Sequence, residues 1–294
     1  MGIDARGGIA IVQIIFYIPI LVASVIITLR HGFTKRAGWI MLLVLALIRI
    51  IGGAIHIASE NNPSNDNLRI TYSILEGAGL SPLLVATIGF LTTIAEHAFN
   101  ENPLMEKGLR ILGVMAIVGI VLIIVGGTQT ASADGDISKL NQAMTLRHAG
   151  SIIFVVLFVL LVLVHLFFWA NRRTILEHRR KLLIGISCAL PFLGVRVIYG
   201  ILSSYAPLIP TEKGGLSQFS LSTGSWGIYL GMSVLMEFAA VLIYTFVGIT
   251  TPLQRDNQAL GSSGSSPQTQ QWEDSQQYPT HNESGYQYPP YRSS

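Results

Sequence analysis

Apolar runs of about 20 residues recur along the chain and restrict what it can fold into. As a helix rising about 1.5 Å per residue, a run of that length crosses a hydrocarbon core about 30 Å thick. Helices are the expected form because lipid offers the backbone no hydrogen-bond partners. Hydrophobic residues make up 50% of the 294 positions and charged residues only 12%, which excludes an ordinary soluble domain. The sequence therefore predicts an all-α membrane protein.

The predicted architecture is a seven-transmembrane helix bundle. We place the spans at about 9–29, 37–58, 69–95, 109–128, 148–170, 181–204 and 225–250. No further apolar run remains for an eighth span.

Lys and Arg are unevenly distributed between the loops and indicate the orientation. The loops after the first, third and fifth spans, at 30–36, 99–108 and 171–180, hold with their flanking residues most of these charges: Arg30, Lys35 and Arg36; Lys107 and Arg110; and Arg172, Arg173, Arg179, Arg180 and Lys181. The opposite loops, which we expect to hold Lys139 and Arg147, mix basic with acidic residues. Loops rich in Lys and Arg remain in the cytosol. We therefore expect an integral, multi-pass protein of the plasma membrane or an endomembrane, with its N-terminus outside and its C-terminus cytosolic.

The composition changes abruptly after about Thr251. The segment Gly261–Ser294 is rich in Gly, Ser, Gln, Tyr and Pro and almost free of aliphatic residues, so it cannot build a core. We predict a seven-helix transmembrane domain at 1–255 and a disordered cytosolic tail at 256–294. The expected partner is the lipid bilayer, with a tail-binding cytosolic protein as an open alternative. Nothing in the sequence points to nucleic acid.

Four charged residues lie within the predicted spans and away from their ends: Arg49, Glu76, Arg196 and Glu237. A charge near the bilayer centre costs about 2.5–3.5 kcal/mol on insertion scales, so each of them needs a reason. Two positive and two negative charges at similar depth can neutralise one another. We predict that each arginine approaches a glutamate in the bundle interior. One interpretation is that these pairs only determine which helices become neighbours.

Helical spacing places these charges on polar stripes, which should face away from lipid. The stripes are Gln13, Tyr17 and Ser24; Arg49, His56 and Glu60; Phe192, Arg196, Tyr199 and Ser203; and Tyr229, Ser233, Glu237 and Tyr244. We expect Pro82 and Pro191 to bend their helices around an outward-facing cavity. Tyrosine rings beside charges suit an amphiphile better than a bare ion. The predicted ligand-binding residues are Arg49, His56, Glu76, Arg196, Tyr199 and Glu237, with Gln13 and Tyr17 also lining the cavity.

Two other patterns leave alternatives open. His56, Glu60, Glu76 and His148 could form a metal site of a cryptic membrane enzyme. Gly227 and Gly231 form a GxxxG pattern, typical of close packing within the bundle or of a homodimer face. We nevertheless expect no enzyme, and neither catalytic residues nor a metal or cofactor.

Several seven-span families are excluded by their own motifs. A retinal-binding rhodopsin needs a lysine in the last span, and Trp226–Thr250 contains none. Receptors of the rhodopsin type carry Asp-Arg-Tyr and Asn-Pro-x-x-Tyr motifs at positions where this chain has Ala95-Glu96-His97 and Tyr244-Thr245-Phe246-Val247. Seven-helix zinc hydrolases have paired histidines in the last span, where this chain has none.

The chain resembles a family of fungal seven-span membrane proteins known as a domain of unknown function. The residues that carry the resemblance are Arg49-Ile-Ile-Gly-Gly, Glu76-Gly-Ala-Gly-Leu-Ser-Pro, Arg196-Val-Ile-Tyr199 and Glu237, within about 5–255. The architecture is more loosely similar to that of the lipid-translocating exporters of the RTA type. The resemblance implies the seven-span fold and no particular chemistry.

Our leading functional hypothesis is a non-enzymatic membrane protein that senses or translocates a small amphiphilic molecule through a polar intramembrane pocket. The alternatives are a scaffolding protein recruited through its tail and the metal-dependent enzyme described above.

Overall fold

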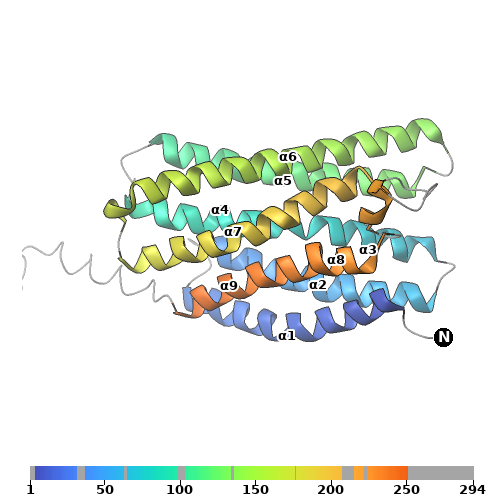
Figure 1. Cartoon of the computed structure of the whole chain (residues 1–294), viewed down its shortest axis with the longest axis horizontal. Coiled ribbons are helices and arrows are strands. Elements are labelled where there is room, and N and C mark those ends of the chain that lie inside the picture. Colours follow the sequence, from blue (N-terminus) through green and yellow to red (C-terminus); the bar gives the residue numbers. More distant parts are fainter. Residues whose placement is uncertain are drawn as a thin grey trace, which may run out of the picture. The chain divides into compact units, whose positions relative to one another are not determined.

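The computed structural model describes residues 4–31, 37–62, 65–98, 103–133, 136–175, 177–206, 215–221 and 224–250. The elements are α1 (Ala5–His31), α2 (Ala37–Asn61), α3 (Asp66–Ala78), α4 (Leu80–Ala98), α5 (Pro103–Ala131), α6 (Ile137–Ala170), η1 (Arg172–Thr174), α7 (Glu177–Ser204), η2 (Gly215–Phe219), α8 (Trp226–Tyr229), η3 (Leu230–Leu235) and α9 (Met236–Thr250) (Figure 1). Seven helical segments are long and apolar enough to cross a membrane, which confirms the seven predicted spans. The predicted tail at 256–294 lies outside the described residues.

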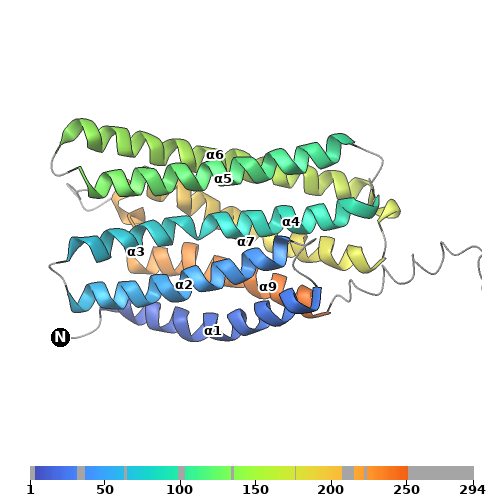
Figure 2. The same ribbon diagram turned by 180° about the vertical axis from the view of Figure 1, so that it is seen from behind.

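The span formed by α3 and α4 lies at the centre of the bundle. It contacts α2, α5 and α7, while α5 pairs with α6 on one side and α1 with α2 on the other (Figures 1 and 2). Of its most apolar stretch 89% is buried, against 22–50% in the other six spans. It is also the least apolar span. Only residues that face lipid must be hydrophobic, and most residues of this span face other helices instead.

The central span is interrupted between Glu76 and Pro82, where we predicted a bend. Here α3 ends at Ala78 and α4 begins at Leu80, with Gly79 between them. Pro82 has no N–H to donate to the carbonyl of Ala78 four residues earlier, so the regular helical hydrogen bonding is broken at this level. By contrast, α7 continues through Pro191, whose side chain is exposed.

The last span contains a π-helical segment, η3, between α8 and α9. A π-turn adds a residue to the helical repeat and shifts which side chains share a face. Three residues of the predicted stripe are buried at this segment: Tyr229 before it, Ser233 within it and Glu237 after it. The π segment therefore lies next to the charged interior.

The helix α6 is longer than its predicted span, because it begins at Ile137 rather than near 148. Asp136 caps it, its carboxylate accepting hydrogen bonds from the amides of Ser138 at 2.9 Å and Lys139 at 3.4 Å. The first turns are polar, so hydropathy alone did not detect them. The expectation that Lys139 and Arg147 belong to an external loop is wrong: both lie in α6.

Glycines bring α5 and α6 close together. A Cβ atom on Gly126 would lie 2.8 Å from the carbonyl oxygen of Ala143, and one on Gly150 would lie 2.9 Å from that of Gly119. The GxxxG pattern of Gly227 and Gly231, expected to give close helix packing in the last span, does not do so at Gly231. A Cβ on Gly231 would meet nothing within 4 Å among the described residues, so the prediction of close intrachain packing at Gly231 is wrong. A homodimer face there stays a prediction.

Candidate functional site

The predicted polar stripes face the bundle interior. Arg49, Glu76, Arg196 and Glu237 are all at most 4% exposed. Most of the other stripe residues follow the same pattern, while Glu60 and Phe192 are only half-buried. The buried ones are Gln13, Tyr17, Ser24, His56, Tyr199, Ser203, Tyr229, Ser233 and Tyr244. Helical periodicity therefore identified the inward faces correctly.

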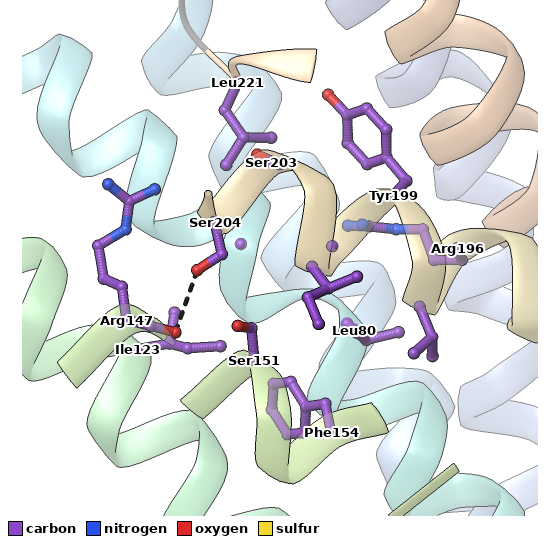
Figure 3. Close-up of a pocket in the computed structure, with 14 residues that line it drawn as sticks. Leu80, Ile123, Arg147, Ser151, Phe154, Arg196, Tyr199, Ser203, Ser204 and Leu221 are labelled. Atoms are coloured by element: carbon purple, nitrogen blue, oxygen red, sulfur yellow. Dashed lines mark hydrogen bonds between the residues drawn. The ribbon is translucent and has the colours of Figure 1, made fainter. Parts of the chain in front are cut away.

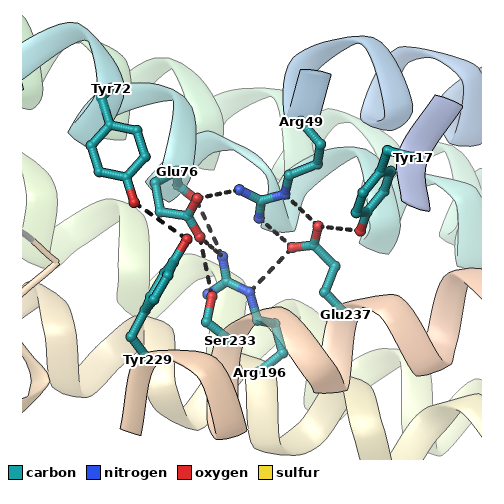
Figure 4. Close-up of polar contacts among 8 residues, drawn as sticks. All are labelled: Tyr17, Arg49, Tyr72, Glu76, Arg196, Tyr229, Ser233 and Glu237. Atoms are coloured by element: carbon teal, nitrogen blue, oxygen red, sulfur yellow. Dashed lines mark hydrogen bonds and ion pairs between the residues drawn. The ribbon is translucent and has the colours of Figure 1, made fainter. Parts of the chain in front are cut away.

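Arg49 from α2 connects the two glutamates (Figure 4). Its Nη1 lies 2.5 Å from Oε2 of Glu76, and its Nε and Nη2 donate to the two carboxylate oxygens of Glu237. The Glu237 contact is a two-pronged guanidinium–carboxylate pair, the strongest arrangement available to these groups. Arg49 thus joins α2 to α3 and α9.

Arg196 from α7 makes longer contacts with the same partners (Figure 4). Its Nε lies 3.4 Å from Oε2 of Glu237, and its Nη2 lies 3.8 Å from Oε1 of Glu76. Nη2 also donates to the backbone carbonyl of Glu76 at 3.2 Å, just before the interruption at Gly79. Two arginines and two glutamates carry no net charge, so the four residues neutralise one another. The predicted pairing of each arginine with a carboxylate is confirmed.

Hydroxyl groups complete the coordination of the carboxylates. Tyr17 of α1 donates to Glu237 at 2.9 Å, and Ser233 of the π segment donates to Glu76 at 3.1 Å. Next to them the hydroxyl of Tyr72 donates to that of Tyr229 at 3.3 Å. We refer to Arg49, Glu76, Arg196 and Glu237 as the charge cluster, which five of the seven spans build or contact.

Gly79 is part of this arrangement, although the sequence analysis assigned it no role. A Cβ atom there would lie 2.5 Å from Nη2 and 2.7 Å from Cζ of Arg49. The Arg49 guanidinium therefore lies directly on the backbone at the interruption of the central span. The available signal was the Gly-Ala-Gly sequence that follows Glu76.

Two adjoining cavities lie beside the charge cluster, between α3, α5, α6 and α7, and Figure 3 shows the residues that line the narrower of the two. The wide cavity has a volume of about 370 Å³, and the narrow cavity has a volume of about 40 Å³. Both are lined by Gly77, Ile123, Arg147, Ser203 and Leu221. Ile70, Thr130, Leu140 and Ser220 place the wide cavity at the end of the bundle predicted to face outward.

The cavities include only part of the predicted binding set. Arg196 and Tyr199 line the narrow cavity, whereas Arg49, His56, Glu76 and Glu237 line neither of the two. Gln13 and Tyr17 line a separate apolar groove of about 510 Å³ between α1 and the last span. Neither the two cavities nor this groove encloses all eight residues predicted to line one cavity, and the members of the charge cluster contact one another directly. Ligand binding by the six predicted residues stays a prediction.

Arg147 is the cavity residue that sequence reasoning missed. Its side chain projects from α6 and lines both cavities (Figure 3). None of the ion pairs among the described residues includes Arg147. The capping residue Asp136, followed by helix-forming residues, was the signal that could have placed Arg147 in a helix.

The histidines of the alternative metal site are engaged separately. His56 lies 3.4 Å from Oε1 of Glu60 and packs on the Tyr72 ring at 4.1 Å between centroids. His148 contacts the carbonyl of Ser204 at 3.0 Å and stacks on the Tyr205 ring. Within the described ranges no three His, Cys, Asp or Glu side chains are grouped as a metal ion would require.

Fold and site together define a class: a multi-pass α-helical membrane protein whose spans meet at a buried, charge-neutral cluster. Within that class, the chain belongs to the family described as Domain of unknown function (DUF7702), whose model matches residues 3–255. No curated protein and no solved structure matches the chain. The expected resemblance to a family known as a domain of unknown function is confirmed. That the family is fungal, and that its architecture is similar to lipid-translocating exporters, stay predictions.

Proposed function

We propose that this protein binds a small amphiphilic molecule in the wide cavity and senses or translocates it without enzymatic chemistry. The observation that carries the proposal is the volume of about 370 Å³ between α3, α5, α6 and α7, within the range of small-molecule sites. The site is therefore next to the charge cluster rather than inside it.

The lining of the wide cavity supports an amphiphile. Ile70, Ile74, Ile123 and Leu140 offer apolar surface, while Ser203, Ser220, Thr130 and Arg147 offer polar groups. A bare ion would not benefit from the aliphatic residues, and a pure hydrocarbon would offer no hydrogen-bond partner to the hydroxyl of Ser203 or to the guanidinium of Arg147.

Arg196 provides a physical route from the cavity to the rest of the bundle. It lines the narrow cavity and also contacts Glu237 at 3.4 Å and Glu76 at 3.8 Å. These distances are longer than the 2.5 Å contact between Arg49 and Glu76, so Arg196 is the more weakly held arginine. A ligand that attracts Arg196 would weaken its contacts with α3 and α9, as a sensor or transporter requires.

Thermal stabilisation by amphiphiles tests this function. The purified protein in phosphatidylcholine nanodiscs is mixed with monododecyl glycerol, dodecyl phosphate or dodecylamine, and its melting temperature is measured. We expect at least one of these probes to raise the melting temperature, since a ligand that binds only the folded state stabilises it.

Variants on one helix locate the effect. Leu140→Trp places a larger side chain in the wide cavity and should abolish the stabilisation. Leu163→Trp, on the exposed face of the same helix, should leave it intact. Equal stabilisation of both variants, or no response of the unmodified protein to any probe, would contradict the proposed site.

A further inference from the structure

We propose that Arg147 and Ser203 form a binding site for an anionic headgroup, of the phosphate, sulfate or carboxylate class, with Tyr199 as a further polar contact. This inference rests on the proposed function and specifies the chemistry of its ligand. It is carried by an uncompensated arginine and by two buried hydroxyl groups beside the same cavities.

Arg147 is fixed in position by close packing of α5 and α6. A Cβ atom on Gly126 would lie 2.8 Å from Cγ of Arg147 and 3.1 Å from its backbone nitrogen. The aliphatic stem of Arg147 is therefore confined against α5, and its half-buried guanidinium reaches both cavities. A guanidinium held at the wall of a cavity is a preorganised donor for anionic oxygens.

The charge of Arg147 is not balanced within the described part of the chain. The charge cluster is neutral by itself. The other ion pairs among the described residues are His56–Glu60 and Arg110–Glu106, so no ion-paired carboxylate is a partner of Arg147. A bound anion would supply the missing negative charge in the place where the cavity already exists.

Two hydroxyl groups beside the cavities lack partners as well. Ser203 is 4% exposed and Tyr199 is 1% exposed, and neither hydroxyl has a hydrogen-bond partner among the described residues. Ser203 lines both cavities together with Arg147, and Tyr199 lines the narrow one (Figure 3). Buried polar groups are nearly always hydrogen-bonded, so these two hydroxyls call for a partner that enters from outside the chain.

The depth of Arg147 fits a headgroup. It lies one residue before the apolar stretch that begins at about 148, so it is at the predicted outer boundary of the hydrocarbon core. This is the level at which lipid headgroups lie. Next to it, the wide cavity offers aliphatic surface for the apolar part of the same molecule.

Charge-selective binding in nanodiscs tests the proposal. The dissociation constant of dodecyl phosphate is measured for the unmodified chain, Arg147→Gln, Arg147→Lys and Arg110→Gln, the last an exposed arginine on α5. Arg147→Gln should weaken binding about tenfold, equivalent to about 1.4 kcal/mol. Arg147→Lys should retain part of the affinity, and Arg110→Gln should behave like the unmodified chain.

Neutral and inorganic probes separate the possible outcomes. Binding of monododecyl glycerol should be the same in Arg147→Gln as in the unmodified chain, which also shows that the variant is folded. If dodecyl phosphate and monododecyl glycerol bind equally well and Arg147→Gln affects neither, the headgroup site is overturned while the proposed function stands. If dodecyl phosphate, monododecyl glycerol and dodecylamine all fail to bind the unmodified chain, the proposed function fails.

The source of the anion is identified by inorganic phosphate. Stabilisation by inorganic phosphate alone, lost in Arg147→Gln, would identify a free anion as the ligand. Stabilisation by dodecyl phosphate only would identify the headgroup of an amphiphile. The double variant Ser203→Ala/Tyr199→Phe should weaken dodecyl phosphate binding several-fold, and an unchanged affinity would remove the two hydroxyls from the site.

Discussion

At the scale of single residues, two arginines in the same cluster differ in how firmly they are held. Arg49 pairs with Glu237 through two nitrogens and with Glu76 at 2.5 Å, while Arg196 reaches the same carboxylates at 3.4 Å and 3.8 Å. Arg49 is therefore the more firmly held of the two, and Arg196 lies both in the cluster and at the narrow cavity. Substitutions in the cluster and in the cavity should accordingly have different effects.

Removing one carboxylate should strongly destabilise the bundle. Glu237→Gln leaves Arg49 and Arg196 with one charged partner between them, and an uncompensated buried charge costs about 3–5 kcal/mol. The free energy of unfolding in bicelles measures this loss. Leu47→Ala, on the more exposed part of α2, serves as the control and should cost far less. A similar loss in both variants would show that the pairing contributes little.

Gly79→Ala should also destabilise the protein, for a steric reason. The added methyl group would overlap the Arg49 guanidinium, which its pairs with Glu76 and Glu237 prevent from moving aside. Overpacking of this kind costs about 1–3 kcal/mol. Gly113→Ala on α5 is the matched control, because a Cβ there meets nothing within 4 Å among the described residues. Thermal unfolding of the two variants would contradict the argument if they melted together.

At the scale of elements, the segment between η2 and α8 is fastened to α1. Arg6 donates to the carbonyl oxygens of Leu221 and Gly224, both at 2.5 Å, and its guanidinium lies 5.9 Å from the centre of the Tyr229 ring. Leu221 and Ser220 line the wide cavity. The beginning of α1 thus holds one wall of the proposed binding site in place.

Arg6→Gln should loosen that wall without affecting the charge cluster. The amides of Gly224 and Ser225, which donate to Ser220 at 3.0 Å and to Gln218 at 2.9 Å, should exchange their hydrogens faster. Amides around Glu237 should exchange as before. Hydrogen exchange measured by mass spectrometry in nanodiscs checks both, and unchanged exchange at Gly224 and Ser225 would rule out Arg6 as the fastening residue.

At the scale of the whole molecule, the central α3–α4 span organises the bundle, and the loop charges predict how it lies in the membrane. The loops 30–36, 99–108 and 171–180 are predicted to be cytosolic, because these loops and their flanking residues hold most of the Lys and Arg found between the spans. The wide cavity would then open toward the outside, where an external ligand could reach it.

Two reporters test this orientation. A reporter fused after Ser294 should read cytosolic, and one inserted near Gly214 should read external. In a chain whose native Cys188 is replaced by Ala, single cysteines introduced at the same two positions also allow thiol labelling from either side of the membrane. Detection of both reporters on one side would contradict an odd number of spans.

The sequence predicted the spans, the inward faces and the four-charge cluster because each depends on local chemistry. Hydropathy locates lipid-facing residues, helical spacing groups Arg196 with Tyr199, and the cost of charges in lipid requires Arg49 to have partners. The walls of the wide cavity were not predicted, because they depend on how helices pack against each other. Arg147 was missed because its stretch of α6 is polar, and Gly231 suggested a contact that the bundle does not make.

The charge cluster also has a consequence for biogenesis. Spans of a multi-pass protein enter the membrane in chain order, and α9, which carries Glu237, comes last. Until it arrives, Arg49 and Arg196 share Glu76 alone and one positive charge stays unbalanced. A nascent chain can therefore be distinguished from a finished one by its charge within the bilayer.

A chain truncated before Trp226 should be degraded faster than the full chain. Replacing both Glu237 and Arg196 by Leu in the full chain should slow its degradation relative to Glu237→Leu alone.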